Sequence, residues 1–243
     1  MSVPINTAVI LAAGKGTRLR PLTYDIPKGF VKVTDETLIE RSIRILKDNG
    51  IENIIVGCGH QGQHYEGIQD KYGLTIYYNN DYSDTGSLYT MSLSHHHVKG
   101  DFLLLESDIM YEPLSISTLL SDDHNNLILA SGQTNSGDEV YIETDANGLL
   151  KKLSKKRDDI DQLTGELVGI SRISKDTLMS LVNLVQADPD WRKKDYEDGL
   201  VNMAQKHTIQ VKLVEDLVWC EIDNEEHLNR AKNLIVPKLE LKA

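Results

Sequence analysis

Cysteine is scarce in this 243-residue chain, and long apolar runs are absent from it. Cys58 and Cys220 are the only cysteines, and neither belongs to a C-x-x-C pair. We expect both to be reduced residues of the core or of strands, with a single disulfide as the alternative. No apolar run approaches the ~20 residues that a membrane-spanning helix needs. Met1–Thr7 also lacks the basic region of a signal peptide. These absences predict a cytoplasmic protein without a membrane partner.

Basic residues are also in deficit. Lys and Arg number 26 against 37 Asp and Glu, so the net charge is 26 − 37 = −11. A surface this acidic repels phosphate backbones, which argues against broad nucleic-acid binding. It leaves room for one small nucleotide in a locally basic pocket. A hydrophobic fraction of 40% supplies enough apolar material for a sizeable core.

Strand and helix patterns alternate through the first half of the chain. Short apolar runs predict strands over Ala8–Ala13, Ile51–Gly57, Thr75–Asn79 and Phe102–Glu106. Helices are predicted between them over Leu38–Asp48, Tyr65–Tyr72 and Ser87–Ser94. This alternation is typical of crossover units, so it predicts an α/β fold with a parallel sheet.

The regular alternation of strand and helix patterns ends after Ser107. Further strands are predicted over Leu127–Ser131, Val140–Thr144, Leu149–Ser154, Leu167–Ser171 and Ile209–Leu213. Two more helices are predicted over Leu178–Ala187 and Tyr196–Lys206. With no repeat or flexible linker between the halves, we expect one domain over 1–243. Its nucleotide-binding half would be 1–110 and its acceptor-binding half 111–243.

The most informative segment is Leu11–Lys28, LAAGKGTRLRPLTYDIPK. A predicted buried strand runs into Gly14 and Gly16, whose backbone can pass close to a phosphate chain and bind it through N–H groups. Arg18 can grip phosphate oxygens with two hydrogen bonds, and Lys28 supplies a compact positive charge. Two cations beside a glycine loop suit a nucleoside triphosphate.

Other glycine-loop families fit this segment poorly. It is not a P-loop, since G-x-x-x-x-G-K-[ST] is missing, and Gly14-x-Gly16 lacks the third glycine of a dinucleotide-binding loop. The plain alternative is a tight strand-to-helix turn with surface cations. The length of the whole segment favours the phosphate site.

This segment resembles the nucleotide-binding motif of the sugar-phosphate nucleotidyltransferase-like superfamily. The resemblance implies a Rossmann-like mixed, mostly parallel sheet flanked by helices, with a smaller acceptor-binding lobe. It also implies a lysine that acts at the α-phosphate, with Lys28 and Arg18 as the catalytic residues. The nucleoside contacts would be Leu11, Ala12, Ala13 and Gly14, and the phosphate contacts Gly16, Thr17, Arg18 and Lys28. Gly29-Phe30 departs from the family pattern, so the resemblance does not say which residues form the pocket wall beside Lys28.

Two aspartates are candidate metal ligands. Asp108 follows the predicted strand Phe102–Glu106, and ligands bind beyond the carboxyl ends of strands in open α/β sheets. Asp223 lies in WCEIDNEEH near the end of the sequence, and Glu221 is a possible assistant. Mg²⁺ prefers one or two carboxylates together with phosphate oxygens and water. The two aspartates resemble the metal pair of the family; solvated strand ends or helix caps are the alternative.

The base-reading segment is expected in Asn79–Ser94, at the turn that contains Asp84, Gly86 and Ser87. Its N-x-x-Y…S-L-Y pattern resembles choline-phosphate and phosphonate cytidylyltransferases. This resemblance implies CTP as the nucleotide, whereas the residue types alone fit a capped helix start equally well.

The second half is rich in acidic residues beside aromatics, which suits an acceptor with a cationic head group. We interpret Glu139, Glu166, Tyr196 and Asp198 as candidate ammonium contacts and Lys155 as a contact for the acceptor's anionic group. The pattern resembles 2-aminoethylphosphonate cytidylyltransferases, some of which are fused to an aminotransferase. We therefore rank 2-aminoethylphosphonate first, phosphocholine second and a sugar 1-phosphate third.

Three further questions stay open at this point. A non-catalytic nucleotide sensor on the same fold would have no need for Lys28, Asp108 and Asp223 together, so an enzyme is the stronger interpretation. A homodimer and a fusion to an aminotransferase are both compatible with the sequence.

Overall fold

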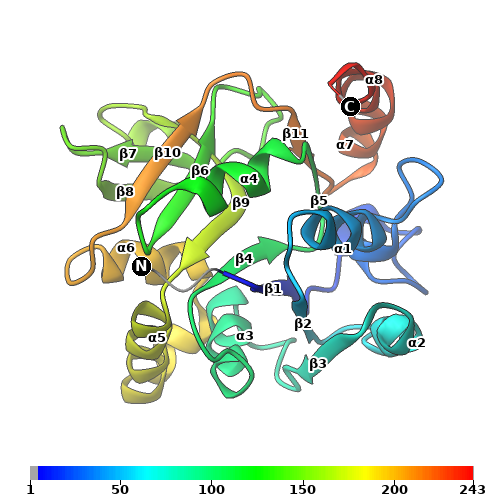
Figure 1. Cartoon of the computed structure of the whole chain (residues 1–243), viewed down its shortest axis with the longest axis horizontal. Coiled ribbons are helices and arrows are strands. Elements are labelled where there is room, and N and C mark those ends of the chain that lie inside the picture. The colour runs from blue at the N-terminus through cyan, green and yellow to red at the C-terminus, as the bar shows by residue number, and fades with distance from the viewer. Residues whose placement is uncertain (1–4, 243) are drawn as a thin grey trace.

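A computed structural model describes residues 5–242, and a mixed sheet of nine strands runs through it (Figure 1). Seven strands lie in the order β10-β6-β9-β4-β1-β2-β3. In chain order these strands are β1 (Thr7–Ala12), β2 (Asn53–Cys58), β3 (Leu74–Tyr78), β4 (Phe102–Glu106), β6 (Leu127–Ser131), β9 (Gly165–Ile173) and β10 (Gln210–Val214). Strands β1 to β4 are mutually parallel, and β9 runs antiparallel to its neighbours β4 and β6.

A hairpin extends the sheet beside β9. It consists of β7 (Tyr141–Thr144) and β8 (Leu150–Ser154), and β7 pairs with β9. Strands from both halves of the sequence thus share one sheet, because β4 of the first half pairs directly with β9 of the second.

Helices cover both faces of the sheet (Figure 1). One face packs against α1 (Leu38–Asp48), α2 (Gln63–Tyr72) and α4 (Leu114–Ser121). The other face packs against α3 (Ser87–Leu93), α5 (Lys175–Ala187) and α6 (Tyr196–Met203). Alternate residues of β1 explain this arrangement, since Ala8 and Ile10 point to the first cluster and Val9 and Leu11 to the second. A strand buried on both faces reads as a continuous apolar run.

A third apolar cluster lies under the C-terminal end of the chain. It packs Met110, Cys220 and Ile222 against α7 (Glu225–Arg230), a π-helical turn (Ala231–Ile235) and α8 (Val236–Leu241). Two short antiparallel strands, β5 (Ile109–Tyr111) and β11 (Trp219–Glu221), join this region to the sheet. This pairing places residue 223 beside residue 108, although the two are far apart in the sequence.

The predicted fold class is confirmed: the sheet is mixed, mostly parallel and flanked by helices. Each predicted strand and helix overlaps an observed one. The elements that the sequence did not predict are β5, α4, β11 and the C-terminal helices. Short 3₁₀ helices complete the chain at Thr17–Leu19, Lys28–Phe30, Ser94–His96, Arg157–Asp159 and Pro189–Lys193. Both cysteines are free and buried, as expected. Within residues 5–242 every helix is too short or too polar to span a lipid bilayer.

Candidate active site

A cavity of about 600 Å³ opens at the carboxyl ends of β1 and β4. The two strands are parallel neighbours, with Leu11 opposite Glu106, and the backbone N–H of Ser107 donates to the Leu11 carbonyl at 3.2 Å. Segments that follow these strands therefore meet at one edge of the sheet. The second half of the chain closes the other side of the cavity with residues 136–140, with β9 and with the start of α6.

The glycine loop lies along this edge. Gly16 has φ +60°, a left-handed conformation that glycine adopts without strain, and its carbonyl accepts a hydrogen bond from Thr23 Oγ1 at 2.7 Å. A Cβ atom at position 16 would lie 2.8 Å from Cγ of Lys28. The absence of a side chain at Gly16 therefore allows the loop to pack directly against Lys28.

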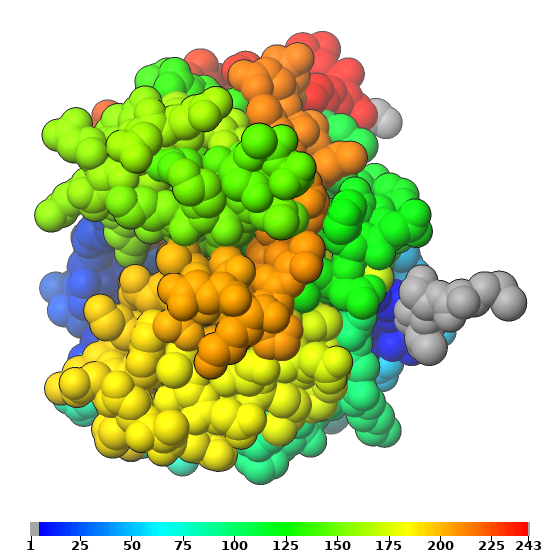
Figure 2. Space-filling model, turned by 90° about the vertical axis from the view of Figure 1, so that its left-hand side faces the viewer, coloured from blue at the N-terminus to red at the C-terminus, as the bar shows by residue number. Residues whose placement is uncertain are grey.

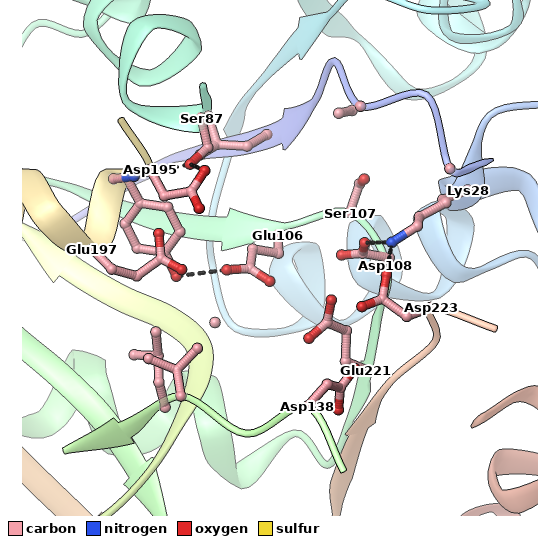
Figure 3. A pocket seen from close by; sticks show the side chains of 18 of the residues that line it. Lys28, Ser87, Glu106, Ser107, Asp108, Asp138, Asp195, Glu197, Glu221 and Asp223 are labelled. Atoms are coloured by element: carbon pink, nitrogen blue, oxygen red, sulfur yellow. Dashed lines mark hydrogen bonds and ion pairs between the residues drawn. The ribbon is translucent and has the colours of Figure 1, made fainter. Parts of the chain in front are cut away.

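Lys28 lies at one end of the cavity, beside Asp108 and Asp223 (Figure 3). Its Nζ donates to Asp108 Oδ2 at 2.7 Å and to Asp223 Oδ1, and Arg18 donates to the other oxygen of Asp223. Burial alone would lower the pKa of Lys28, but the charges of Asp108 and Asp223 outweigh burial and raise it. Burial would likewise raise the pKa of Asp223, whereas Lys28 above all holds it at about 2. The lysine is therefore charged, and so is the aspartate beside it.

Two groups of three carboxylates could hold a metal ion here. One consists of Glu106, Asp108 and Glu221, the other of Asp138, Glu221 and Asp223, and in each group the ligand atoms lie within 4.8 Å of one another. These oxygen-only donors fit Mg²⁺, a hard cation that binds carboxylates and phosphate oxygens. The donor set thus agrees with the predicted cofactor, and it adds Glu221 and Asp138 to the predicted pair.

The pKa values of the carboxylates reflect their crowding. Burial raises the pKa of Glu221 to about 11, with further contributions from the charges of Asp108 and Glu106. Burial and the charges of Asp108 and Glu197 raise the pKa of Glu106 to about 8. A bound cation would relieve this repulsion, because it favours the charged form of every carboxylate around it.

The start of α6 forms the opposite end of the cavity. Ser87 accepts a hydrogen bond from the backbone N–H of Tyr196 at 2.9 Å, and the Tyr196 hydroxyl donates to Glu106 Oε1 at 2.7 Å. Lys155 forms an ion pair with Asp195 at 3.2 Å. Figure 3 shows Glu197 and Glu106 facing each other across this end. The segment predicted to read the base and the segment predicted to bind the acceptor are therefore in direct contact.

Most predicted site residues lie along the cavity. Its lining includes Leu11, Ala12, Ala13, Gly14, Gly16, Arg18, Lys28, Gly86, Ser87, Asp108, Glu139, Lys155, Tyr196 and Asp223.

Four predicted site residues lie outside the cavity. Thr17 lines a neighbouring hollow with Lys15 and Tyr82, and Asp84 is exposed in the turn before α3. Glu166 is buried within β9 and accepts a hydrogen bond from the backbone of Thr134, while Asp198 is exposed on α6. Their roles as ligand contacts stay predictions without support from the cavity.

Further residues that were not predicted as site residues also line the cavity. Among them are Tyr65, Glu106, Asp138, Asp195 and Glu197. Glu106 had a usable signal, because it is the last residue of a buried strand and immediately precedes Ser107-Asp108. Tyr65 had none, since it reaches the cavity from α2 on one face of the sheet.

Comparison with known proteins gives the chain a family. The nucleotidyl transferase family model matches residues 7–162. The choline-phosphate cytidylyltransferase of Streptococcus pneumoniae is 30% identical over 156 residues, which cover 60% of this chain and 68% of that protein. The CTP:phosphoglutamine cytidylyltransferase of Campylobacter jejuni is 25% identical over 240 residues, 89% of this chain and 95% of that protein. The inositol-1-phosphate CTP transferase of T. maritima shares the fold, with a TM-score of 0.84 at 21% identity over 100% of this chain and 97% of that one.

Proposed function

The chain belongs to the nucleotidyl transferase family, and from this premise we propose that it transfers CMP from CTP to 2-aminoethylphosphonate and releases pyrophosphate. The observation that carries the chemistry is the position of Lys28, between Asp108 and Asp223 in a cavity bounded by the glycine loop. A cation held by two carboxylates beside an anion-binding loop is suited to the phosphates of a nucleotide.

The reaction is an in-line displacement at the α-phosphorus. A phosphonate oxygen of the acceptor forms a new P–O bond, the bond from the α-phosphorus to the bridging oxygen breaks, and pyrophosphate leaves with the electron pair. The attacking oxygen is already anionic, so no general base is required. Positioning and electrostatic stabilisation therefore supply most of the catalysis.

The residues of the cavity divide this work. The backbone of the glycine loop and Arg18 hold the phosphates, and Lys28 neutralises charge that develops on the α-phosphate oxygens. Mg²⁺ would be held by carboxylates of the two groups that share Glu221, with Asp108 from one group and Asp138 and Asp223 from the other. When bound, the ion supplies Lewis-acid stabilisation of phosphate charge.

CTP is proposed on the basis of the relatives and of the segment before α3. Two cytidylyltransferases are among the similar proteins, and Gly86 and Ser87, the residues proposed to contact the base, line the cavity.

The acceptor is proposed from the charge of the side chains that line the cavity. Eight acidic side chains and three basic ones line the cavity, and two of the three bases are already paired with Asp108 and Asp223. An acceptor with a cationic head would offset part of that excess.

Pyrophosphate release in the presence of Mg²⁺ tests the proposal. Each of the four NTPs would be assayed against 2-aminoethylphosphonate, phosphocholine, phosphoethanolamine and glucose 1-phosphate. Turnover with CTP and the aminophosphonate is the expected result. Preference for phosphocholine or a sugar phosphate would keep the chemistry and replace the acceptor. No pyrophosphate release with any combination of NTP and acceptor would favour a nucleotide sensor instead.

A further inference from the structure

The end of the cavity away from Lys28 is lined by more acidic side chains than basic ones. Glu106 projects from the end of β4, and Asp195 and Glu197 project from the start of α6 (Figure 3). Lys155 is the one basic side chain that lines this end, and it is 66% exposed and already paired with Asp195. Both Glu106 and Glu197 therefore line the cavity without an ion-pair partner among the residues that the structure describes.

One oxygen of Glu197 lacks a hydrogen-bond partner at this end of the cavity. Its Oε2 is buried and has no hydrogen-bond partner among residues 5–242, although the residue lines the cavity. A buried carboxylate oxygen without a donor is costly, and native structures usually satisfy it. Glu106, which lines the same end of the cavity, already accepts one hydrogen bond from Tyr196 and has further acceptor capacity.

The backbone of β9 passes close to one of these two groups. Gly169 of β9 has φ +78°, and a Cβ atom there would lie 3.0 Å from the carboxyl carbon of Glu106. Glycine at this position thus lets β9 pack against Glu106, and Gly169, Glu106 and Glu197 all line the cavity. On the surface seen in Figure 2, the segment of β7 and β8 (yellow-green) lies above residues 175–200 (yellow).

We propose that Glu106 and Glu197 together bind a primary ammonium group of the acceptor through N–H···O hydrogen bonds. This inference rests on the proposed function and refines its acceptor to a short ω-amino phosphonate or phosphate. A primary ammonium offers three N–H donors, which match the free carboxylate oxygens. A trimethylammonium group has no N–H donor and is bound mainly by aromatic faces. A carboxylate pair therefore selects the primary amine.

Two comparisons of acceptors test the inference on the unaltered protein. In n-propylphosphonate a methyl group replaces the ammonium of 2-aminoethylphosphonate, and in phosphocholine the nitrogen carries no hydrogen. We expect kcat/KM with CTP to favour 2-aminoethylphosphonate over either compound by at least about a hundredfold, because a site built for hydrogen bonds discriminates strongly against a ligand without donors. Equal turnover of n-propylphosphonate, or a preference for phosphocholine, would overturn the inference.

The matched variant is Glu197→Gln. We expect KM for 2-aminoethylphosphonate to rise about tenfold to a hundredfold and the preference over n-propylphosphonate to fall by a similar factor, whereas KM for CTP changes much less. Asp190→Asn is the control, since it removes one exposed acidic charge from the same half of the chain. An unchanged KM for the aminophosphonate in Glu197→Gln would reject the ammonium site.

These outcomes separate the inference from the proposed function. If the unaltered protein releases no pyrophosphate from CTP with any acceptor, the proposed function itself fails. If it turns over 2-aminoethylphosphonate but does not discriminate among the acceptors, only the ammonium site fails. If Glu197→Gln does not fold, the comparison of acceptors on the unaltered protein still decides the question.

Discussion

At the scale of single residues, Gly29 explains how the chain departs from the family pattern after Lys28. A Cβ atom at position 29 would lie 2.7 Å from the hydroxyl oxygen of Tyr65, which reaches the cavity wall from α2. Glycine thus makes room for a buried tyrosine hydroxyl directly beside Lys28. The pocket wall beside Lys28 is therefore formed in part by Tyr65, which lies outside the glycine-loop motif.

Gly29→Ala should therefore impair the enzyme, because Tyr65 and the segment that carries Lys28 would be pushed apart. We expect a loss of stability of about 1–3 kcal/mol, typical of overpacking, and reduced pyrophosphate release. Tyr65→Phe removes the clashing oxygen, so the double variant Gly29→Ala, Tyr65→Phe should recover most of both losses. Urea unfolding and turnover of all three variants measure this coupling. Losses that simply add in the double variant would contradict the assigned contact.

Lys28 itself permits a sharper prediction. Lys28→Met keeps much of the side-chain length but removes the charge between Asp108 and Asp223, so we expect kcat to fall by about 10²-fold or more. KM for CTP should change less, since the glycine loop and Arg18 still hold the phosphates. Lys32→Met removes an exposed lysine four residues away and is the control. Single-turnover rates near those of the unaltered protein would remove Lys28 from its assigned role.

At the scale of elements, helix α1 starts with a reciprocal cap. The Thr37 side chain accepts a hydrogen bond from the Glu40 backbone, and the Glu40 side chain accepts from the Thr37 backbone and hydroxyl, with Tyr72 and Lys71 of α2 as further donors. This capping box fixes the start of α1, and Tyr72 also connects the helix to α2. Partial burial alone would raise the pKa of Glu40, but these hydrogen bonds outweigh it and lower the pKa to about 2.

The lowered pKa makes the contribution of Glu40 depend on pH. The folded-state value lies below the ordinary value of 4.5, so the stabilisation is present above pH 4.5 and is lost as the pH falls toward 2. Glu40→Gln keeps a side chain that can complete the box, so we expect it to cost about 1 kcal/mol at pH 7 and less at pH 3.5. Urea unfolding at several pH values checks this. A difference between the two proteins that grows on acidification would contradict the sign.

Which elements could be predicted depends on how local their signal is. Strand β1 is readable because a strand buried on both faces is a continuous apolar run, and α1 because its apolar residues recur at helical spacing. Strands β5 and β11 each have three residues and depend on one another across more than a hundred residues of sequence. Strands this short show no periodic pattern of apolar residues in the sequence, yet their pairing brings Asp223 close to Asp108. As a pair of metal ligands, Asp108 and Asp223 are therefore predicted by resemblance, and only the structure shows that the two residues lie beside one another.

The acceptor end was harder to predict for a related reason. Glu166 and Asp198 are chemically plausible from their neighbours in the sequence, but Glu166 is buried in β9 and Asp198 is exposed on the outer side of α6. Glu197 is adjacent to Asp198, and only the direction of the helix decides which of the two side chains reaches the cavity. A one-residue choice of this kind requires knowledge of what the helix packs against.

At the scale of the whole molecule, the chain has a net charge of −11, and part of this acidic excess lies in the cavity. The cavity alone combines eight acidic side chains with three basic ones. Burial above all, and then the charges of neighbouring carboxylates, raise the pKa values of Glu221 and Glu106. Repulsion among these carboxylates opposes the compact state. A divalent cation that binds the folded chain, and not the unfolded one, should therefore stabilise the whole protein.

We expect Mg²⁺ at tenfold its dissociation constant to add about 1.4 kcal/mol to the free energy of unfolding. For a chain of this size such a gain raises Tm by about 3–6 °C, and a thermal melt without nucleotide measures it. NaCl at equal ionic strength is the control for general screening. Glu221→Gln should reduce the gain, because the amide resembles the protonated acid in shape but is a weaker ligand for Mg²⁺. An equal rise of Tm in this variant would place the stabilising ion elsewhere, and a rise reproduced by NaCl would mean that screening alone stabilises the chain.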